Sequence, residues 1–263
     1  MKKLTALLKN MAYRAFIAVW CAARPLLTWL NRHSDSYCPV CEKPSRFVIR
    51  REGATPEDSG IGEVCPICFS RPRHRLSWLY MCKKTNLLDG VPKRLLHLAP
   101  EMEFTRRFRA IPGVIYLSAD LDHPGAMRRI DLTDIDWPAE SFDLIYCSHM
   151  LEHIPQDRKA MGELYRVLDK NGWVLVQVPL SMEHSTQENL AITDPKERER
   201  LYGQWDHVRL YGKDIVDRLR DTGFAVSVVL GSDILTPEEC RRMNIAPGEL
   251  LFSCNKTPQA DAA

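Results

Sequence analysis

The sequence lacks an apolar run long enough to cross a membrane. The stretch at residues 15–23 (AFIAVWCAA) spans nine residues and lies between Arg14 and Arg24, whereas a membrane-spanning helix needs about 20 apolar residues. Arg14 also interrupts the apolar core that a signal peptide requires, and the CAARP that follows is a poor cleavage site. We therefore expect neither a transmembrane span nor secretion, and the sequence favours a cytoplasmic protein.

Internal repeats, low-complexity tracts and a disulfide framework are also absent. Four of the nine cysteines form two CxxC pairs and the others are scattered, which favours a reducing compartment and one metal site. With 263 residues, 45% of them hydrophobic, the chain can bury one full-sized core and carry a smaller module. The net charge of +2 divides unevenly: residues 1–93 hold 16 Lys/Arg against 7 Asp/Glu, and residues 94–263 hold 20 against 27. The two portions are expected to meet different partners.

Residues 1–36 are predicted to form a basic amphipathic helix. Apolar side chains recur at helical spacing between residues 4 and 30, lysines and arginines fall opposite, and Pro25 is expected to kink the helix. One interpretation is a helix lying on the anionic inner face of a membrane, where its cations and Trp20 suit the lipid headgroups. The other is a helix packed on its own domain, and the sequence leaves both open.

Two CxxC pairs of the same build, Cys38-Pro-Val-Cys41 and Cys65-Pro-Ile-Cys68, are separated by 23 residues. Each turn can place two thiolates about a tetrahedral ion at sulfur–metal distances of about 2.3 Å, and two turns complete a site with no open position. We predict that Cys38, Cys41, Cys65 and Cys68 bind a structural zinc. This zinc-ribbon-like module and a linking helix would span residues 37–92.

A basic cluster directly follows the second pair and contains Arg71, Arg73, His74 and Arg75. Such side chains could bind phosphate or an acidic partner. Alternatively, they solvate the module or pair with the acidic portion of the chain.

From residue 93 to residue 256 the pattern alternates between strands and helices, which indicates a doubly wound, Rossmann-like α/β domain with a parallel sheet. The helical patterns that end at Gly172 and Gly223 carry glycine as a stop signal. The connection between the last two strands is too short for a full crossover, so an antiparallel last strand is expected. Residues 257–263 are predicted to be a disordered tail. The seven expected strands cover residues 94–99, 114–120, 129–132, 142–149, 173–179, 225–230 and 250–255.

Three carboxylates stand at the carboxyl ends of expected strands, where ligands of open parallel sheets bind. Glu101 follows the first strand in a turn that contains no glycine (RLLHLAPEMEF), Asp120 ends the second, and Asp131 ends the third. Each could also be a helix cap or a loop residue. Asp120 is suited to accept hydrogen bonds from ribose hydroxyls, and Asp131 can reach an exocyclic amine.

These segments resemble the class I S-adenosylmethionine-dependent methyltransferases, and FDLIYCSHMLEHI is the most specific of them. The resemblance covers residues 94–256 and implies a seven-stranded sheet with an antiparallel last strand. The whole chain is similar to a bacterial group of such enzymes with a front CPxC module and an LHxAPE first motif. The resemblance to the class I family implies that Asp120 binds the ribose, that Asp131 and Leu132 bind the adenine, and that Ser148 or His149 lines the pocket.

The first motif departs from the acid-x-glycine-x-glycine pattern of that family. His97 stands at the acid, Ala99 at the first glycine, and Glu101 near the second. S-adenosylmethionine carries no phosphates, so the amides that demand glycine in dinucleotide folds are not required. We predict that Glu101 instead neutralises the ammonium group of the cofactor.

Methyl transfer requires alignment of the acceptor and, for oxygen or nitrogen acceptors, removal of a proton. His207 is the best candidate base and His149 the second; Glu152 and His153 are further candidates that could simply begin a helix and pack beneath the sheet. A polar insertion at residues 181–204 stands where a substrate lid would lie. The segment after it supplies Asp206, His207, Arg209 and Tyr211, which either bind the acceptor or, for Asp206 and Arg209, hold the lid shut by pairing.

The leading hypothesis is therefore a methyltransferase that acts on a small molecule or a glycan or lipid precursor. One alternative is an RNA methyltransferase whose zinc module recognises the nucleic acid. Another is a catalytically silent, zinc-dependent interaction protein.

Overall fold

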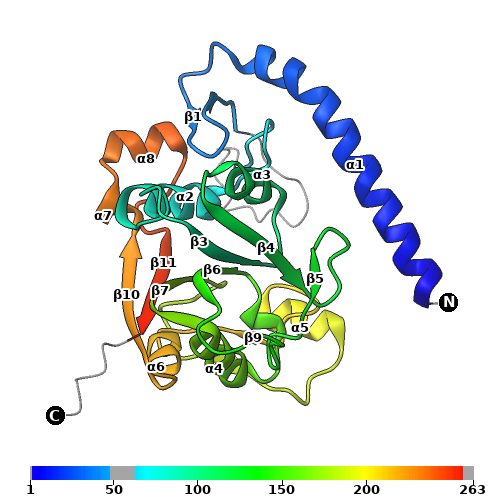
Figure 1. The fold of residues 1–263 in the computed structure, drawn as a ribbon, viewed down its shortest axis with the longest axis vertical. Coiled ribbons are helices and arrows are strands. Elements are labelled where there is room, and N and C mark those ends of the chain that lie inside the picture. Colours follow the sequence, from blue (N-terminus) through cyan, green and yellow to red (C-terminus); the bar gives the residue numbers. More distant parts are fainter. Residues whose placement is uncertain (1, 48–62, 257–263) are drawn as a thin grey trace.

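The structure is a computed structural model that describes residues 2–47 and 63–256. It begins with the long helix α1 (Lys2–Asn31), which continues through Pro25 and runs along one side of the molecule (Figure 1). A small hairpin of β1 (Tyr37–Cys38) and β2 (Lys43–Pro44) follows, and then α2 (Pro72–Lys84). The predicted disordered tail at residues 257–263 lies outside the described residues. No helix among the described residues is long and apolar enough to cross a membrane.

A seven-stranded sheet in the order β10-β11-β7-β6-β3-β4-β5 forms the centre of the molecule (Figure 1). All neighbours are parallel except β11, which is antiparallel to both β7 and β10. The predicted doubly wound sheet with an antiparallel last strand is therefore confirmed. The strands are β3 (Lys93–Leu98), β4 (Val114–Asp120), β5 (Arg128–Arg129), β6 (Phe142–Ser148), β7 (Leu168–Gln177), β10 (Phe224–Leu230) and β11 (Leu250–Lys256).

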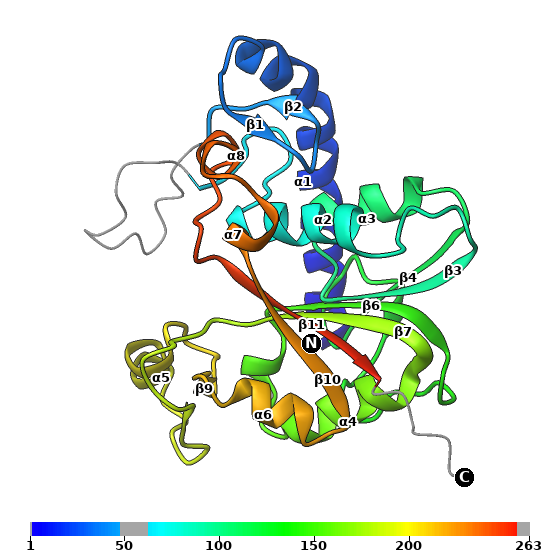
Figure 2. The same cartoon turned by 90° about the vertical axis from the view of Figure 1, so that its left-hand side faces the viewer.

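Helices cover both faces of this sheet (Figure 2). One face carries α2, α3 (Met102–Ala110), α7 (Gly231–Ile234) and α8 (Pro237–Met243), and the other carries α4 (Asp157–Val167) and α6 (Ile215–Arg220). The insertion contains β8 (Gln187–Glu188) and α5 (Pro195–Tyr202), and β8 pairs with β9 (Arg209–Leu210) after it. A short 3-10 helix, η1 (Leu151–His153), follows β6.

Two hydrophobic clusters lie on the two faces because side chains of a strand alternate between its sides. In β3, Leu96 and Leu98 join the cluster beneath α4 and α6, whereas Leu95 joins the cluster beneath α2 and α3. This second cluster also contains the four cysteines of the two CxxC pairs. The front module and one face of the sheet thus share a continuous core.

The expected helix end at Gly172 is wrong. Helix α4 ends at Val167, β7 begins at Leu168, and Gly172 lies inside that strand. A side chain there would meet the backbone oxygen of Asp143 at 2.5 Å, so glycine permits close approach of the two strands. The expected stop at Gly223 is confirmed, since this residue follows α6 with φ +104° and its amide binds the Arg220 carbonyl.

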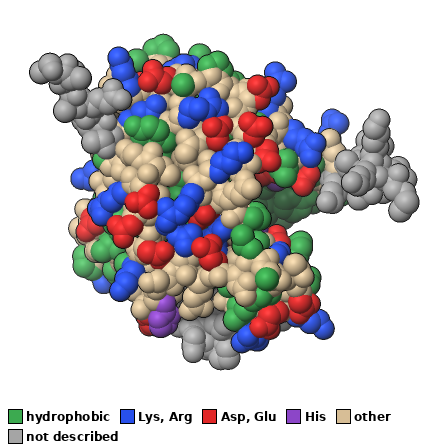
Figure 3. Space-filling model, turned by 90° about the horizontal axis from the view of Figure 1, so that it is seen from below, with side chains coloured by type: hydrophobic (Ala, Val, Ile, Leu, Met, Phe, Trp, Pro, Cys, Tyr) green, Lys and Arg blue, Asp and Glu red, His purple; other side chains and the backbone are tan. Residues whose placement is uncertain are grey.

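The outer surface of the molecule on the side of α4 and α6 carries mixed charges. Figure 3 shows Lys and Arg interspersed with Asp and Glu on the underside of the molecule. Arg158 pairs with Asp221 at 2.8 Å, and Arg218 pairs with Asp157 and Glu188 at 3.0 and 2.9 Å. Among the described residues, charges of both signs are therefore interspersed on this face.

Candidate functional site

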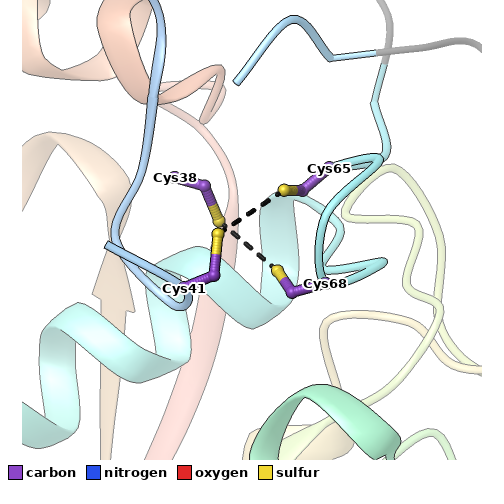
Figure 4. Close-up of side chains that lie close together, drawn as sticks. All are labelled: Cys38, Cys41, Cys65 and Cys68. Atoms are coloured by element: carbon purple, nitrogen blue, oxygen red, sulfur yellow. Dashed lines mark hydrogen bonds between the residues drawn. The ribbon is translucent and has the colours of Figure 1, made fainter. Parts of the chain in front are cut away.

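The four cysteines meet at one buried point (Figure 4). Their Sγ atoms lie 3.6 Å apart between Cys38 and Cys68 and 3.8 Å apart between Cys41 and Cys65. Ligands at about 2.3 Å from a tetrahedral ion are about 3.8 Å apart, so these spacings suit one metal ion. Ser45 donates a hydrogen bond to the Cys65 sulfur from 3.2 Å, which orients that ligand. The arrangement is compatible with zinc.

Arg75 is fully buried beside this cluster. Its guanidinium donates to the carbonyls of Glu63, Ser70 and Asn244 and stacks on the Phe47 ring at 4.2 Å. Burial lowers the pKa of Arg75, and negative cysteine thiolates oppose that shift. Arg75 is therefore not available to an external phosphate, but its charge complements a metal held by four thiolates.

A cavity of about 1270 Å³ opens at the carboxyl ends of the parallel strands. It lies between β3 and β6, where the order of the parallel strands in the sheet reverses, the point at which open α/β sheets bind ligands. The walls come from α1, the cysteine module, the turn after β3, the end of β6 and the insertion. They include Tyr13, Phe16, Phe69, Arg71, Arg73, His74, Glu101, His123, His149, Glu152, His153, Tyr202 and His207.

The turn after β3 contains no glycine but has one left-handed residue, Ala99. Ala99 has φ +45°, a left-handed conformation that favours glycine, and its amide binds the Ala119 carbonyl of β4 at 3.0 Å. Ala99 thus adopts a backbone conformation that glycine favours. Glu101 follows as the N-cap residue of α3, and its side chain faces the cavity.

Two histidines hold Glu101 in its ionised form. His74 Nε2 lies 3.1 Å and His97 Nε2 lies 3.4 Å from its carboxylate oxygens. Burial alone would raise the pKa of Glu101, but the charge of His74 and the close approach of both imidazoles hold it well below its usual range. Burial would likewise lower the pKa of His74, but Glu103, 2.6 Å from Nδ1, and Glu101 raise it. The basic cluster therefore pairs with the sheet domain through His74, while Arg71 and Arg73 line the cavity.

The other expected cofactor residues lie along the same edge of the sheet. Asp120 ends β4, and its Oδ1 accepts hydrogen bonds from the amides of Asp122 and His123 at 2.7 and 2.6 Å. Asp131 is exposed after β5 and binds Thr133, and Leu132 is buried. None of the three lines the cavity directly, although His123 does. Ser148 is buried at the end of β6, and its hydroxyl has no hydrogen-bond partner among the described residues.

Both candidate bases line the cavity. His149 has φ +52° at the end of β6, and its Nδ1 lies 3.2 Å from the carboxylate of the fully buried Glu152. Burial lowers the pKa of His149, although Glu152 opposes that shift. His207 Nδ1 lies 2.8 Å from the Tyr202 carbonyl, to which it donates, so Nε2 is left able to accept a proton.

The remaining residues expected to bind the acceptor have structural contacts. The fully buried Arg209 donates to three backbone carbonyls in residues 151–155 and pairs with Glu188 of β8 at 2.9 Å. The Tyr211 hydroxyl donates to Asp157 at 2.9 Å. Asp206 lies 3.4 Å from His153 and does not line the cavity. Arg209 thus ties the insertion to the segment after β6, but through Glu188 and carbonyls rather than through Asp206.

Two cavity residues on α1 were not expected from the sequence. Tyr13 packs edge-on against His123 at 5.2 Å, and Phe16 stacks on Phe69 of the cysteine module at 5.8 Å. Trp20, which suited lipid headgroups in the sequence, is instead buried and donates to the Ile67 carbonyl at 2.9 Å. Apolar periodicity predicted this helix but not which structure its apolar side chains contact.

The topology of the sheet and the cavity at its switch point define a Rossmann-like protein that can hold a nucleotide-like cofactor. Residues 59–228 match the family described as a methyltransferase domain. This match covers more than half of the chain, and the protein belongs to that family. The resemblance to methyltransferases inferred from the sequence is thereby confirmed.

Several solved structures are similar to this chain. A S-adenosylmethionine-dependent methyltransferase from Mesorhizobium loti is 17% identical, with a TM-score of 0.45 over 69% of this chain and 98% of its own. The 1,6-didemethyltoxoflavin-N1-methyltransferase of Burkholderia thailandensis, solved with its substrate and S-adenosylhomocysteine, is 14% identical, with a TM-score of 0.45 over 71% and 78%. No curated protein matches the sequence.

Proposed function

We propose that this methyltransferase transfers the methyl group of S-adenosylmethionine to an oxygen or nitrogen atom of a small molecule or a glycan or lipid precursor. The observation that carries the proposal is the cavity, in which an ionised carboxylate, Glu101, and two histidines, His149 and His207, face one space. Arg71 and Arg73 on its wall favour an acceptor that carries an anionic group.

In the proposed cofactor site, Glu101 attracts the ammonium group of the methionine moiety. Asp120 accepts hydrogen bonds from the ribose hydroxyls, since only its Oδ1 is engaged by backbone amides. Asp131 and Leu132 bind the adenine, and Ser148 contributes its unpaired hydroxyl after β6. The sulfonium is already activated, so these residues mainly position the methyl group. His207 takes the acceptor proton on Nε2, with His149 as the second candidate.

Asp120→Asn tests the cofactor site. The amide oxygen can still bind the turn at residues 122–123, but the negative charge that faces the ribose is lost. We expect the affinity for S-adenosylhomocysteine, measured by calorimetry, to fall about tenfold, because a hydrogen bond to a charged group contributes about 1.5–3 kcal/mol. Asp122→Asn, at the exposed neighbouring position, is the control and should bind as the wild type does. Unchanged affinity in Asp120→Asn would contradict the assignment.

The acceptor can be sought directly. Cell extract incubated with the protein and isotopically labelled S-adenosylmethionine should contain, by mass spectrometry, a metabolite that gains one labelled methyl group. The silent interaction protein is the correct interpretation if the protein neither binds S-adenosylhomocysteine nor labels any product.

An RNA acceptor is the second candidate, because Arg71 and Arg73 line the cavity and residues 1–93 are strongly basic. This candidate predicts RNA binding whose affinity falls steeply with salt. If RNA binding is absent or does not depend on salt, the RNA acceptor is ruled out and the small-molecule acceptor remains.

We also propose that α1 touches the inner face of a membrane. Its exposed apolar side chains include Met11, Val19, Leu26, Trp29 and Leu30. Arg14 and Arg24 belong to the same helix, and Arg32 directly follows it. Co-sedimentation with anionic liposomes should be lost when residues 1–30 are deleted. If the truncated protein still co-sediments, another surface makes the contact.

A further inference from the structure

Glu152 is a buried carboxylate that the fold leaves without a hydrogen bond. Its side chain is 0% exposed, and neither oxygen has a hydrogen-bond partner among the described residues. His149 Nδ1 approaches to 3.2 Å and His207 Nε2 to 4.0 Å, without the geometry of hydrogen bonds. Burial of an ion costs several kcal/mol unless the ion is paired or coordinates a metal. Glu152 therefore calls for a cationic partner.

Two histidines converge on this carboxylate. Glu152, His153 and His207 each offer one metal-ligating atom, and these three atoms all lie within 4.8 Å of one another. The ring centroids of His153 and His207 are 4.8 Å apart. Ligands at about 2.1 Å from one ion are about 3–4 Å apart, so a shift of about 1 Å would close the set. Two imidazoles and one carboxylate are a common donor set for first-row divalent metals with positions left open for substrate.

The surroundings of both histidines match those of metal ligands. His207 Nδ1 lies 2.8 Å from the Tyr202 carbonyl, and His153 Nδ1 lies 3.4 Å from the Asp206 carboxylate. In metal sites the second ring nitrogen of a ligating histidine donates to a carbonyl or carboxylate in this way, which fixes the ring and its tautomer. The Nε2 atoms are thus the ones left to bind an ion.

Local structure explains why these residues meet. The helix η1 places Glu152 and His153 together directly after β6. The chain after the insertion returns to the same point, where the Val208 amide donates to the Glu152 carbonyl at 2.9 Å. Residues more than fifty positions apart therefore share one wall of the cavity.

We propose that Glu152, His153 and His207 bind one divalent first-row transition metal ion in the cavity, separate from the four-cysteine site. Cysteine thiolates select soft ions such as zinc, whereas an imidazole–carboxylate set also accepts Mn²⁺. A metal here would bind a hydroxyl oxygen of the acceptor and lower the pKa of that hydroxyl, which favours O-methylation. This role rests on the proposed function with His149, the second candidate, as the base, because a His207 Nε2 that binds the metal cannot also take a proton. The binding of the metal does not rest on the proposed function.

Mn²⁺ is the probe, because the four-cysteine site has little affinity for it. Titration of the full-length protein with MnCl₂, followed by electron paramagnetic resonance of the free ion, should show one bound Mn²⁺ per chain. We expect Glu152→Gln to weaken binding at least tenfold, and His153→Asn, at a partly exposed position, to do the same. His184→Asn, at an exposed histidine outside the set, should bind as the wild type does.

A thermal measurement supplies a second readout. Mn²⁺ should raise the melting temperature of the wild type but not that of Glu152→Gln. Equal Mn²⁺ binding by the wild type and by both ligand variants, or no binding by the wild type, would overturn the metal site. Normal binding of S-adenosylhomocysteine without binding of Mn²⁺ would refute the metal site and leave the cofactor assignment. Binding of Mn²⁺ without binding of S-adenosylhomocysteine would refute the cofactor assignment and leave the metal site.

Discussion

At the residue scale, Ala99 and His149 carry left-handed backbones at the ends of the neighbouring strands β3 and β6, with φ of +45° and +52°. Such conformations cost non-glycine residues about 1–3 kcal/mol each and persist where the surroundings impose them, often at functional sites. Here they stand on the two sides of the switch point of the sheet. The turn after β3 therefore has a left-handed residue, the conformation that glycine favours, although it contains no glycine.

The charges at Glu101 predict a pH dependence of stability. The raised pKa of His74 means that its stabilising pairs with Glu101 and Glu103 are complete below about pH 6.5 and are lost as the pH rises through the folded-state pKa. The lowered pKa of Glu101 means that its own contribution, present above about pH 4.5, is lost only in strong acid.

We therefore expect the free energy of unfolding to fall as the pH is raised from about 6.5. His74→Gln should flatten that fall and cost about 1–3 kcal/mol at pH 6, because Glu101 and Glu103 both lose their partner on α2 and Glu101 keeps only His97. Urea denaturation across the pH range measures both effects, and His33→Gln, at an exposed histidine, is the control. A variant that keeps the slope of the wild type would show that His74 is neutral in the fold.

At the element scale, two glycines on the path from α4 to β7 have opposite roles. Gly162 lies inside α4 with nothing within 4 Å of an added Cβ, whereas a Cβ on Gly172 would meet a β6 carbonyl at 2.5 Å. We expect Gly162→Ala to stabilise the protein by about 1 kcal/mol, since alanine favours helix. Gly172→Ala should destabilise it by about 1–3 kcal/mol through overpacking. Chemical denaturation of this pair provides the comparison, and equal effects would contradict the close approach of β6 and β7.

The elements with strong patterns were predictable from the sequence. Apolar runs located six of the seven strands of the sheet, and the limits of residues 114–120 agree with those of β4. The strand expected at residues 129–132 overlaps β5 only at Arg129. The sequence could not indicate the pairing of β8 with β9, because two-residue strands carry no periodicity. It also could not pair Glu101 with His74, or Tyr13 with His123, because such contacts depend on how distant elements pack. The acids and histidines were proposed for the site because of their chemistry, and their roles stay predictions. The sequence left two roles open for Arg209, because its burial is not visible in the neighbouring residues.

At the scale of the whole molecule, the cysteine module and the sheet share one hydrophobic cluster. A metal held by the four cysteines would therefore stabilise the entire fold rather than an appendage. We expect Cys65→Ser, or removal of the metal by a chelator, to lower the melting temperature by about 10 °C or more in a single transition. Elemental analysis of the purified protein should find zinc, and Cys21→Ser, at an exposed cysteine, is the control. Two separate transitions in calorimetry would show instead that the module melts alone.

The position of α1 has a consequence for turnover. Tyr13 and Phe16 line the cavity, while Val19 and Trp29 of the same helix are exposed on the outside. Because a helix moves as a stiff body, displacement of its outer side also displaces the wall over His123. The rate at which spent cofactor leaves the proposed site and fresh cofactor enters would then depend on the surface that contacts the outer side of α1.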